Sequence, residues 1–218
     1  GNWSPPQVPT AADNAFITNS GTYTVTLSAA STAGSVTAGG ASGTQTLNLD
    51  KFVLTLNGPS VINANGHLDM LLNCGIAGAG NLTVNGTLNW QNGALNGTGA
   101  ITVNSGGILV IGPNNVTLGR TLSNGGAATW VGGNLSMSAG SVLNNLAGGT
   151  FDITADGRLS GTTATINNSG LFRQTAGTTG TTIGAPFNNS GTVQVQTLTL
   201  SLNNGGTHTG TFNVAGGA

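Results

Sequence analysis

Charged residues are scarce in this sequence, and their scarcity narrows the range of partners. Only 4% of the 218 residues are charged, against roughly a quarter in an ordinary soluble domain. The acidic residues are all Asp, and the formal net charge is -1. Nucleic acid and anionic membrane surfaces both require a basic patch, so we expect neither as a partner.

Cysteine and long apolar runs are also nearly absent. Cys74 is the only cysteine, so no disulfide can form within the chain, and its apolar neighbours predict a buried, inert thiol. No run of 18 apolar residues occurs, which argues against a membrane-spanning helix. The sequence begins at Gly1 without a signal-like segment, as a processed exported chain or a trimmed piece would.

Helix-forming residues are few, whereas Gly, Asn, Thr, Ser and Val are abundant. This balance opposes helices and favours short strands joined by tight turns. No segment shows the i, i+3, i+4 apolar spacing of an amphipathic helix. Disorder usually accompanies high net charge and few β-branched residues, and neither condition applies here.

A 21-residue repeat is the strongest feature of the sequence. Segments that open with a small residue and continue in apolar alternation start at Gly86, Gly107, Ala128, Gly149, Gly170 and Gly191. Weaker copies start at Gly66 and Gly210. Stacked coils bring equivalent residues back at a fixed interval, which an antiparallel sandwich does not require. We therefore predict an all-β fold, a right-handed parallel β-helix (β-solenoid) with about 21 residues per rung and roughly ten rungs.

Alternation within the rung predicts which side chains are buried. The second position should face inward, at Leu88, Leu109, Trp130, Phe151, Phe172 and Val193. The fourth should also face inward, at Trp90, Ile111, Gly132, Ile153, Gln174 and Val195. The third should face outward, at Asn89, Val110, Val131, Asp152, Arg173 and Gln194.

Two further strands are expected in each rung. An inward column is predicted at Ile101, Leu122, Leu143, Ala164 and Ala185. A mixed column follows two residues later, at Val103, Asn124, Asn145, Ile166 and Phe187. The third strand is predicted from the apolar residues in the middle of the rung, Leu95, Val116 and Met137.

Asn and Gly mark the turns, because both tolerate the left-handed backbone of sharp corners. Asn-Asn-Ser-Gly occurs at 167–170 and 188–191, and Asn-Ser-Gly-Gly at 104–107. The spacing places Asn167 over Asn188 and Asn168 over Asn189. We expect these amides to pair from rung to rung as ladders.

The chain is expected to form one domain, residues 1–218. Residues 66–218 hold the regular coils, and residues 21–65 predict less regular first coils. The proline-rich start leads us to predict a cap over residues 1–20, because the end of a solenoid exposes a core and strand edges.

The opening segment resembles a known class of proteins. Residues 8–17 (Val-Pro-Thr-Ala-Ala-Asp-Asn-Ala-Phe-Ile), followed by Gly-Thr-Tyr-Thr-Val-Thr-Leu at 21–27, are similar to the start of large secreted bacterial β-helix proteins. Residues 81–86 and 166–170 match repeat motifs of the same autotransporter-passenger-like and surface-adhesin-like chains. The resemblance implies a right-handed parallel β-helix at the bacterial cell surface or outside the cell, and it carries over no catalytic residue.

Polysaccharide-cleaving enzymes also use β-helices, so the charged residues need attention. Their sites require clustered carboxylates, often with Arg or Lys. The best cluster here is Asp152, Asp156, Arg158 and Arg173. Asp152 and Arg173 share the outward column one rung apart, which predicts a surface ion pair. We therefore predict that the protein is not an enzyme.

No metal or cofactor site is predicted either. His67 and His208 lie at opposite ends of the repeat region, without Cys or Glu near them. No phosphate-binding or calcium-binding glycine motif occurs. We assign no catalytic, cofactor-binding or metal-binding residue.

A glycan-binding or polysaccharide-cleaving β-helix is the alternative function, and an ice-binding solenoid is a lesser one. Trp3 and Tyr23 are candidates for stacking on sugars, because Trp90 and Trp130 fall in inward columns. Ice binding would need regular Thr columns. Only a partial column is present at Thr87, Thr129, Thr150 and Thr192, interrupted by Ile108 and Leu171.

The last coil points to the leading hypothesis. Strand edges in natural proteins are usually guarded by Lys, Pro or charge, and residues 197–218 contain none of these. We therefore expect an extracellular structural or adhesive module whose coils stack end to end, between subunits or with neighbouring segments of a longer chain, as a fibre, sheath or adhesin-stalk subunit. Its partners would be copies of itself or cell-surface and matrix components, with glycans as an alternative.

Overall fold

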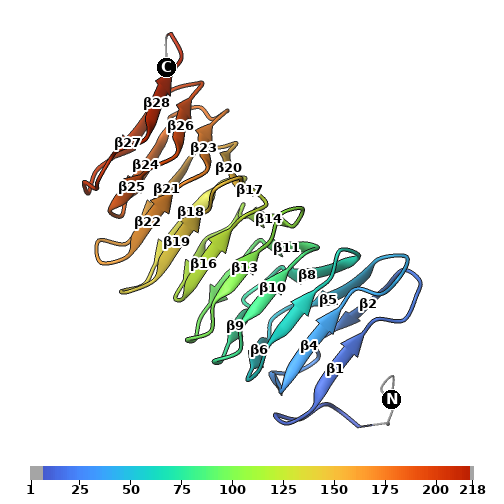
Figure 1. Ribbon diagram of the computed structural model, residues 1–218. Helices are drawn as coiled ribbons and strands as arrows, with labels where there is room; N and C mark the ends of the chain where they lie inside the picture. Colours follow the sequence, from blue (N-terminus) through green and yellow to red (C-terminus); the bar gives the residue numbers. More distant parts are fainter. Residues whose placement is uncertain (1–6, 217–218) are drawn as a thin grey trace.

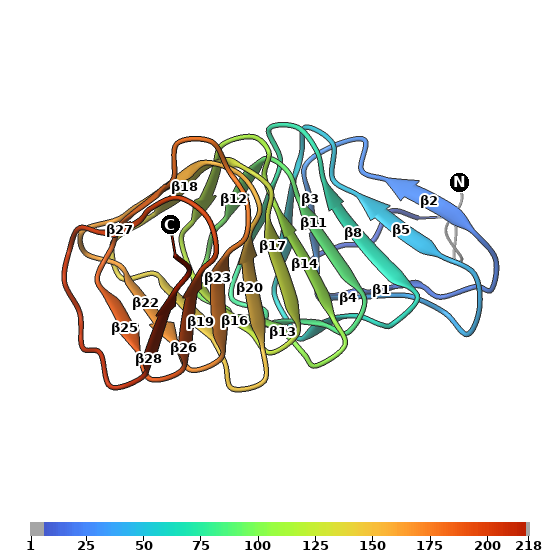
Figure 2. The same ribbon diagram turned by 90° about the horizontal axis from the view of Figure 1, so that it is seen from above.

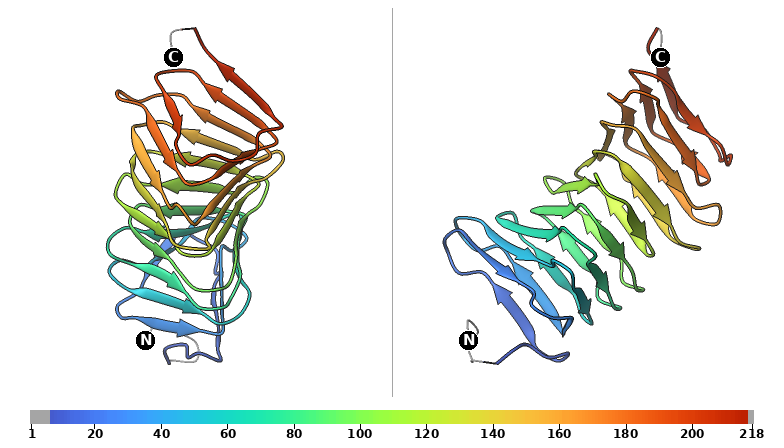
Figure 3. Two further views of the ribbon diagram at one scale, coloured as in Figure 1. Left: turned by 90° about the vertical axis from the view of Figure 1, so that its left-hand side faces the viewer. Right: turned by 180° about the vertical axis from the view of Figure 1, so that it is seen from behind.

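The computed structural model describes residues 7–216, and within that range it contains 28 strands and no helix. The strands form three parallel sheets wound into a right-handed β-solenoid of about ten turns (Figures 1 and 3). The predicted fold is confirmed. Accordingly, the described residues contain no helix long and apolar enough to cross a membrane.

Each coil contributes one strand to each sheet in turn, and we call the sheets A, B and C. Sheet A contains β1 (Asn14–Ile17), β4 (Ser35–Ala38), β7 (Ser60–Ile62), β10 (Leu82–Val84), β13 (Ile101–Val103), β16 (Thr121–Asn124), β19 (Val142–Asn145), β22 (Thr165–Asn168) and β25 (Phe187–Asn189). Sheet B contains β2 (Tyr23–Thr26), β5 (Gln45–Asn48), β8 (Gly66–Met70), β11 (Thr87–Trp90), β14 (Ile108–Ile111), β17 (Ala127–Trp130), β20 (Thr150–Ile153), β23 (Leu171–Gln174), β26 (Thr192–Val195) and β28 (Thr211–Val214). Sheet C contains β3 (Ser31–Ala33), β6 (Val53–Leu56), β9 (Gly75–Ala77), β12 (Gly93–Leu95), β15 (Val116–Leu118), β18 (Gly133–Met137), β21 (Gly157–Ser160), β24 (Thr181–Gly184) and β27 (Leu200–Leu202).

The strands form because short runs of Val, Ile, Leu, Thr and aromatic residues alternate with Gly- and Asn-rich turns. Side chains then alternate between the inside of the coil and the solvent. Figure 2 shows the coils following one another along a single axis, with the N-terminal and C-terminal coils at opposite ends.

The core is one continuous column of apolar side chains inside the coils. Its largest fully buried members are aromatic, namely Trp90, Trp130, Phe151, Phe172 and Phe187. The rings of Phe151 and Phe172 stack with centroids 4.9 Å apart, and Phe187 meets Phe172 edge to face at 5.1 Å. Successive coils thus pack aromatic side chains in direct contact, which adds to the stabilisation from their buried area.

The predicted columns of sheet B hold, with one correction. The strand of the fourth regular coil is β17, which begins two residues earlier than a strict 21-residue count requires. Ala128, not Trp130, lies between Leu109 and Phe151. Trp130 instead takes the fourth position, beside Ile111, where Gly132 had been expected.

The same shift corrects two outward positions. Thr129 occupies the third position, between Val110 and Asp152, in place of the expected Val131. It therefore leaves the partial Thr column, in which Ala127 stands beside Ile108 and Thr150.

Sheet A departs from the expected columns after Leu143. The column continues through Ile166 and Phe187, not through Ala164 and Ala185. Both alanines are buried but precede their strands. The neighbouring inward column is consequently not mixed in its later coils. After Val103 its positions within the strands of sheet A are all asparagines, Asn124, Asn145, Asn168 and Asn189.

The third strand of the rung exists and forms sheet C, as predicted. Its register differs by two residues at one coil, because Leu95 lies beside Leu118 and Met137. Val116, expected in that column, lies one inward position earlier, beside Leu135.

The N-terminal segment enters the first coil along one corner. Within it, Thr10 donates through its backbone N–H and its hydroxyl to the Asp13 carboxylate. Gly34 donates to the Asp13 carbonyl oxygen at 2.8 Å, and Asn57 donates to that of Ala11 at 3.3 Å. Residues 14–17 are already the first strand of sheet A. Part of the cap expected over residues 1–20 lies outside the described residues.

Candidate functional site

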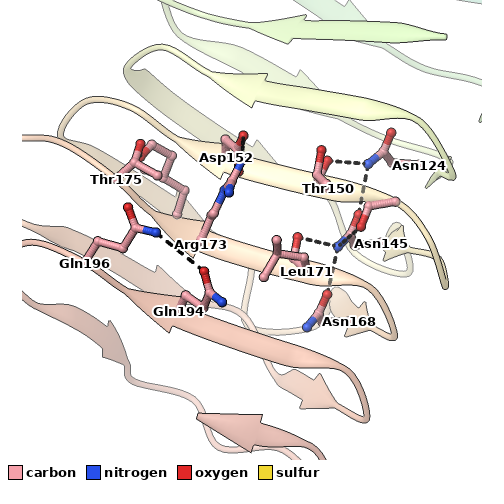
Figure 4. Close-up of polar contacts among 12 residues, drawn as sticks. Asn124, Asn145, Thr150, Asp152, Asn168, Leu171, Arg173, Thr175, Gln194 and Gln196 are labelled. Carbon is pink, nitrogen blue, oxygen red and sulfur yellow. Dashed lines mark hydrogen bonds and ion pairs between the residues drawn. The ribbon is translucent and has the colours of Figure 1, made fainter. Parts of the chain in front are cut away.

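The interior of the solenoid contains a ladder of four buried asparagines at the corner between sheets A and B. Figure 4 shows Asn124, Asn145 and Asn168 of this ladder. We call Asn124, Asn145, Asn168 and Asn189 the inner ladder. Each of the first three donates through Nδ2 to Oδ1 of the next, at 2.8–2.9 Å. Each of the four also donates to a backbone carbonyl oxygen in sheet B, such as Thr150 for Asn124 at 2.8 Å.

The inner ladder thus joins both neighbouring coils and neighbouring sheets. Buried amides of this kind are tolerated only when they have hydrogen-bond partners, which the ladder supplies. The predicted stacking of Asn168 over Asn189 is confirmed. The 21-residue repeat correctly placed Asn124 and Asn145 in one column, but it wrongly continued that column through Ile166 and Phe187.

A second ladder runs on the outer face of sheet A, and it confirms the stacking of Asn167 over Asn188. Asn188 donates to Asn167 and Asn167 donates to Asn144, each at 2.9 Å. Asn144 donates to the hydroxyl of Ser123 at 3.0 Å. These amides are partly exposed, so water competes for the same hydrogen bonds.

The Asp152–Arg173 pair of the predicted charged cluster lies on the outer face of sheet B (Figure 4). Arg173 holds the carboxylate with two hydrogen bonds, Nε to Oδ1 and Nη2 to Oδ2, the latter at 2.8 Å. The expected cross-rung ion pair is confirmed. Both oxygens of Asp152 face the guanidinium, so the pair has the geometry of a structural ion pair.

The carboxylate of Asp156 is hydrogen-bonded to the turn at residues 177–180. It accepts the hydroxyl of Thr178 and the backbone N–H groups of Thr178, Thr179 and Gly180. The Thr178 hydroxyl is the main cause that holds the pKa of Asp156 well below its usual range, with the backbone donors adding to it. A carboxyl group so stabilised as the anion is a poor general acid.

Arg158 is exposed and lines an open groove of about 400 Å³ on the outer face of sheet C. Asp156 also borders this groove, together with Asn134 and the hydroxyl groups of Thr182 and Ser201. The four charged residues of the predicted cluster therefore separate into an ion pair on sheet B and this polar groove on sheet C.

The candidate metal ligands do not meet. His67 lies on sheet B beside Thr46 and Thr87, whereas His208 lies in the last coil. Among residues 7–216, no group of three or more His, Cys, Asp or Glu residues is placed to hold a metal ion. Cys74 is buried, as predicted, and burial raises the pKa of its thiol.

Of the two aromatic candidates, only Tyr23 lies within the described residues, as do the two tryptophans that were expected to face inward. Trp90 and Trp130 are fully buried, and their indole N–H groups donate to the carbonyl oxygens of Gly93 and Gly132. Tyr23 is half-buried at the edge of sheet B and packs against the core. Trp3 lies outside the described residues.

Arg120 is a feature that the sequence analysis missed. It is 3% exposed, and its Nη2 donates to the carbonyl oxygen of Gly78, two coils away, at 2.6 Å. Its Nε and Nη1 have no hydrogen-bond partner within the described chain. The side chain passes over Gly97, where a Cβ atom would lie 2.6 Å from Nη2. Burial lowers the pKa of the guanidinium.

The C-terminal coil is open at its far side. β28 forms the edge of sheet B, β27 the edge of sheet C, and β25 the edge of sheet A, extended by a single bridge between Asn189 and His208. Phe212 and Val214 continue the inward columns but are 42% and 62% exposed, because no further coil within residues 7–216 covers them.

The opposite end shows the complementary arrangement. β1, β2 and β3 are the edges of their sheets, and the inward residues of the first coil include Tyr23, Val25 and Leu27. These three are only partly buried, although they pack against the core. Among residues 7–216, both ends therefore present unpaired strand edges around an apolar centre.

Comparison with known proteins adds no assignment. No family model matches the chain, and no curated protein and no solved structure matches it either.

Proposed function

We propose that this β-solenoid is an extracellular structural or adhesive module that stacks end to end, as a fibre, sheath or adhesin-stalk subunit, and that it has no catalytic role. The open C-terminal coil is the observation that carries the proposal. Its three strand edges and its two apolar side chains, Phe212 and Val214, lie where the next coil would pack.

Covering this end stabilises the assembly in two ways. An unpaired parallel edge offers N–H and C=O groups that another strand completes. Burying the exposed halves of Phe212 and Val214 contributes roughly 1 kcal/mol each, because full burial of such a side chain is worth about 1.5–3 kcal/mol. Since β28 carries no charged residue, no ion must be desolvated there.

The two ends differ, so contact between them is head to tail. A contact of that type does not close on itself and produces an open filament unless the rotation closes a ring. The extracellular setting is supported by the resemblance of residues 8–27 to secreted bacterial β-helix proteins. The absence of a catalytic role is supported by Asp152 and Asp156, whose carboxylates are both engaged in structural contacts.

Concentration-dependent assembly is the test. We expect sedimentation velocity and electron microscopy to show chains of stacked particles that lengthen with protein concentration. Phe212→Asp should abolish them by placing a charge at the junction. Ile108→Asp is the matched control, because Ile108 is similarly exposed, at 45%, but lies in the middle of sheet B. Particles that stay monomeric at high concentration, or equal loss in both variants, would refute the proposal.

Glycan binding is a second candidate function. The groove beside Arg158 is a better candidate for the binding site than a surface of exposed aromatic residues. Its hydroxyl and amide side chains suit sugar hydroxyls, and an exposed guanidinium suits a carboxylate or sulfate group. Isothermal titration with acidic and neutral oligosaccharides tests this function. We expect Arg158→Ala to lose binding to acidic sugars only, and an absence of binding to either class would eliminate the candidate.

A further inference from the structure

We infer that a second copy of this chain docks on the C-terminal end in one register, with its β2 added to β28 so that its Val25 lies opposite Phe212. The inference rests on the proposed stacking and goes further by fixing which residues meet. In this register Thr24 lies opposite Thr211, and Thr26 lies opposite Asn213.

The register comes from sheet B itself. Residue partners can be followed from β2 to β28 through nine successive pairings without a break in alternation. They connect Thr24 with Thr211 and Val25 with Phe212 at the two ends of the same columns. One more step of the same kind beyond β28 therefore brings the β2 of the next copy into these positions.

The side chains at the two ends match in this register. Phe212 would cover Val25, and Val214 would cover Leu27, so the partly exposed apolar residues of both ends close against each other. A slip of one residue would instead set Phe212 against Thr24 or Thr26, whose side chains face solvent. Because side chains alternate along a strand, such a slip mismatches every pair of the junction.

A slip of two residues preserves alternation in sheet B but fails in the other sheets. Strands of the three sheets run in different directions around the coil (Figure 3). A slide along β28, about 6.6 Å for two residues, therefore carries the edges of sheets A and C sideways off their partners. In the inferred register sheet A continues as well, since the column that contains Asn189 and His208 ends at Ile17 on the N-terminal side.

Paired cysteines test the register directly. All variants carry Cys74→Ala, so that the only thiols are those introduced. Asn213→Cys with Thr26→Cys places two outward-facing thiols in register, with Cα atoms about 4.8 Å apart, inside the range of about 4.4–6.8 Å that a disulfide spans. Asn213→Cys with Thr24→Cys is the matched control. Its Cα atoms would be about 8 Å apart, too far to bridge.

Under mild oxidation, we expect the in-register pair to give a ladder of covalent multimers on a non-reducing denaturing gel, and the control pair to stay monomeric. Equal or stronger cross-linking of the control pair would overturn the register while leaving stacking intact. Filaments seen by microscopy without cross-linking of either pair would do the same. If the unmodified chain forms no assemblies at all, the proposed function fails, and the register inference fails with it.

Discussion

Removing one amide from the inner ladder should destabilise the solenoid far more than removing its outward neighbour. Asn145 accepts a hydrogen bond from Asn124 at 2.9 Å and donates to Asn168 at 2.8 Å and to the Leu171 carbonyl oxygen at 3.0 Å. Asn145→Ala deprives these three groups of that bond, and two of them belong to the fully buried Asn124 and Asn168. At about 1 kcal/mol for each group, the variant loses about 3 kcal/mol of unfolding free energy, before any contribution from the cavity.

Asn144→Ala is the control, because it removes the same amide from the adjacent residue. Asn144 donates to Ser123 and accepts from Asn167, but water can replace both bonds at this partly exposed position. We expect a loss of no more than about 1 kcal/mol. Solenoids can unfold in segments, and the choice of adjacent residues keeps both changes within one unfolding segment.

Urea unfolding followed by circular dichroism gives the free energies, and thermal unfolding gives an independent estimate. For a chain of this size, about 3 kcal/mol corresponds to a lowering of Tm by about 6–12 °C. Equal losses in the two variants, or a loss below about 1 kcal/mol for Asn145→Ala, would refute the argument that the inner ladder holds sheets A and B together.

Three further predictions concern the corners. Gly97→Ala should destabilise the fold much more than Gly106→Ala in urea unfolding: both glycines have positive φ, but only at Gly97 would a Cβ atom meet the Gly78 carbonyl oxygen and the Arg120 guanidinium. Arg120→Met should keep or raise Tm, because it removes a buried cation without a carboxylate partner, and a clear fall in Tm would contradict this. The pKa of Asp156 is lowered in the folded state, so its carboxylate contributes to the free energy of unfolding above about pH 4, and this contribution is lost as the pH falls towards the folded pKa. In urea unfolding measured at a series of acidic pH values, Asp156→Asn should therefore lose less stability on acidification than the unmodified chain does.

The winding of the chain was predictable because coil stacking imposes a repeat on the sequence. Gly86, Gly107, Gly149, Gly170 and Gly191 all occupy the corner before a sheet B strand, where a Cβ atom would press on backbone or neighbouring atoms of the preceding coil. Packing of this kind makes the repeat visible without any structure. The Asn167–Asn188 ladder followed from the same spacing.

The errors arise from corners of unequal length. The turn at 104–107 is two residues longer than the turn at 125–126, although both lead from sheet A to sheet B. The extra residues are exposed to solvent, and a Cβ atom added at Gly106 would have no neighbour within 4 Å. The displacements then cancel, since 19 residues separate Ile108 from Ala127 and 23 separate Ala127 from Thr150. The two intervals average 21 residues, so a search for a fixed 21-residue repeat does not detect either change.

The hydrogen bonds of the inner ladder and the burial of Arg120 could not be predicted from the repeat. Asn124 and Asn145 occupy inward positions, but only the neighbouring coils show that their amides find partners. Arg120 looks like any surface cation in the sequence, and its burial depends on the space over Gly97, which belongs to another coil.

Stacking of the coils disfavours like charges at equivalent positions. Equivalent residues of adjacent coils lie about 4.8 Å apart, and two like charges at that distance repel by about 0.9 kcal/mol even in water. Along the outward column of sheet B that runs from Thr26 to Asn213, the only charges on adjacent coils are Asp152 and Arg173, which are of opposite sign. Asp69 stands between two asparagines. A junction between copies would obey the same rule, because it sets Asn213 against Thr26 and brings no like charges together.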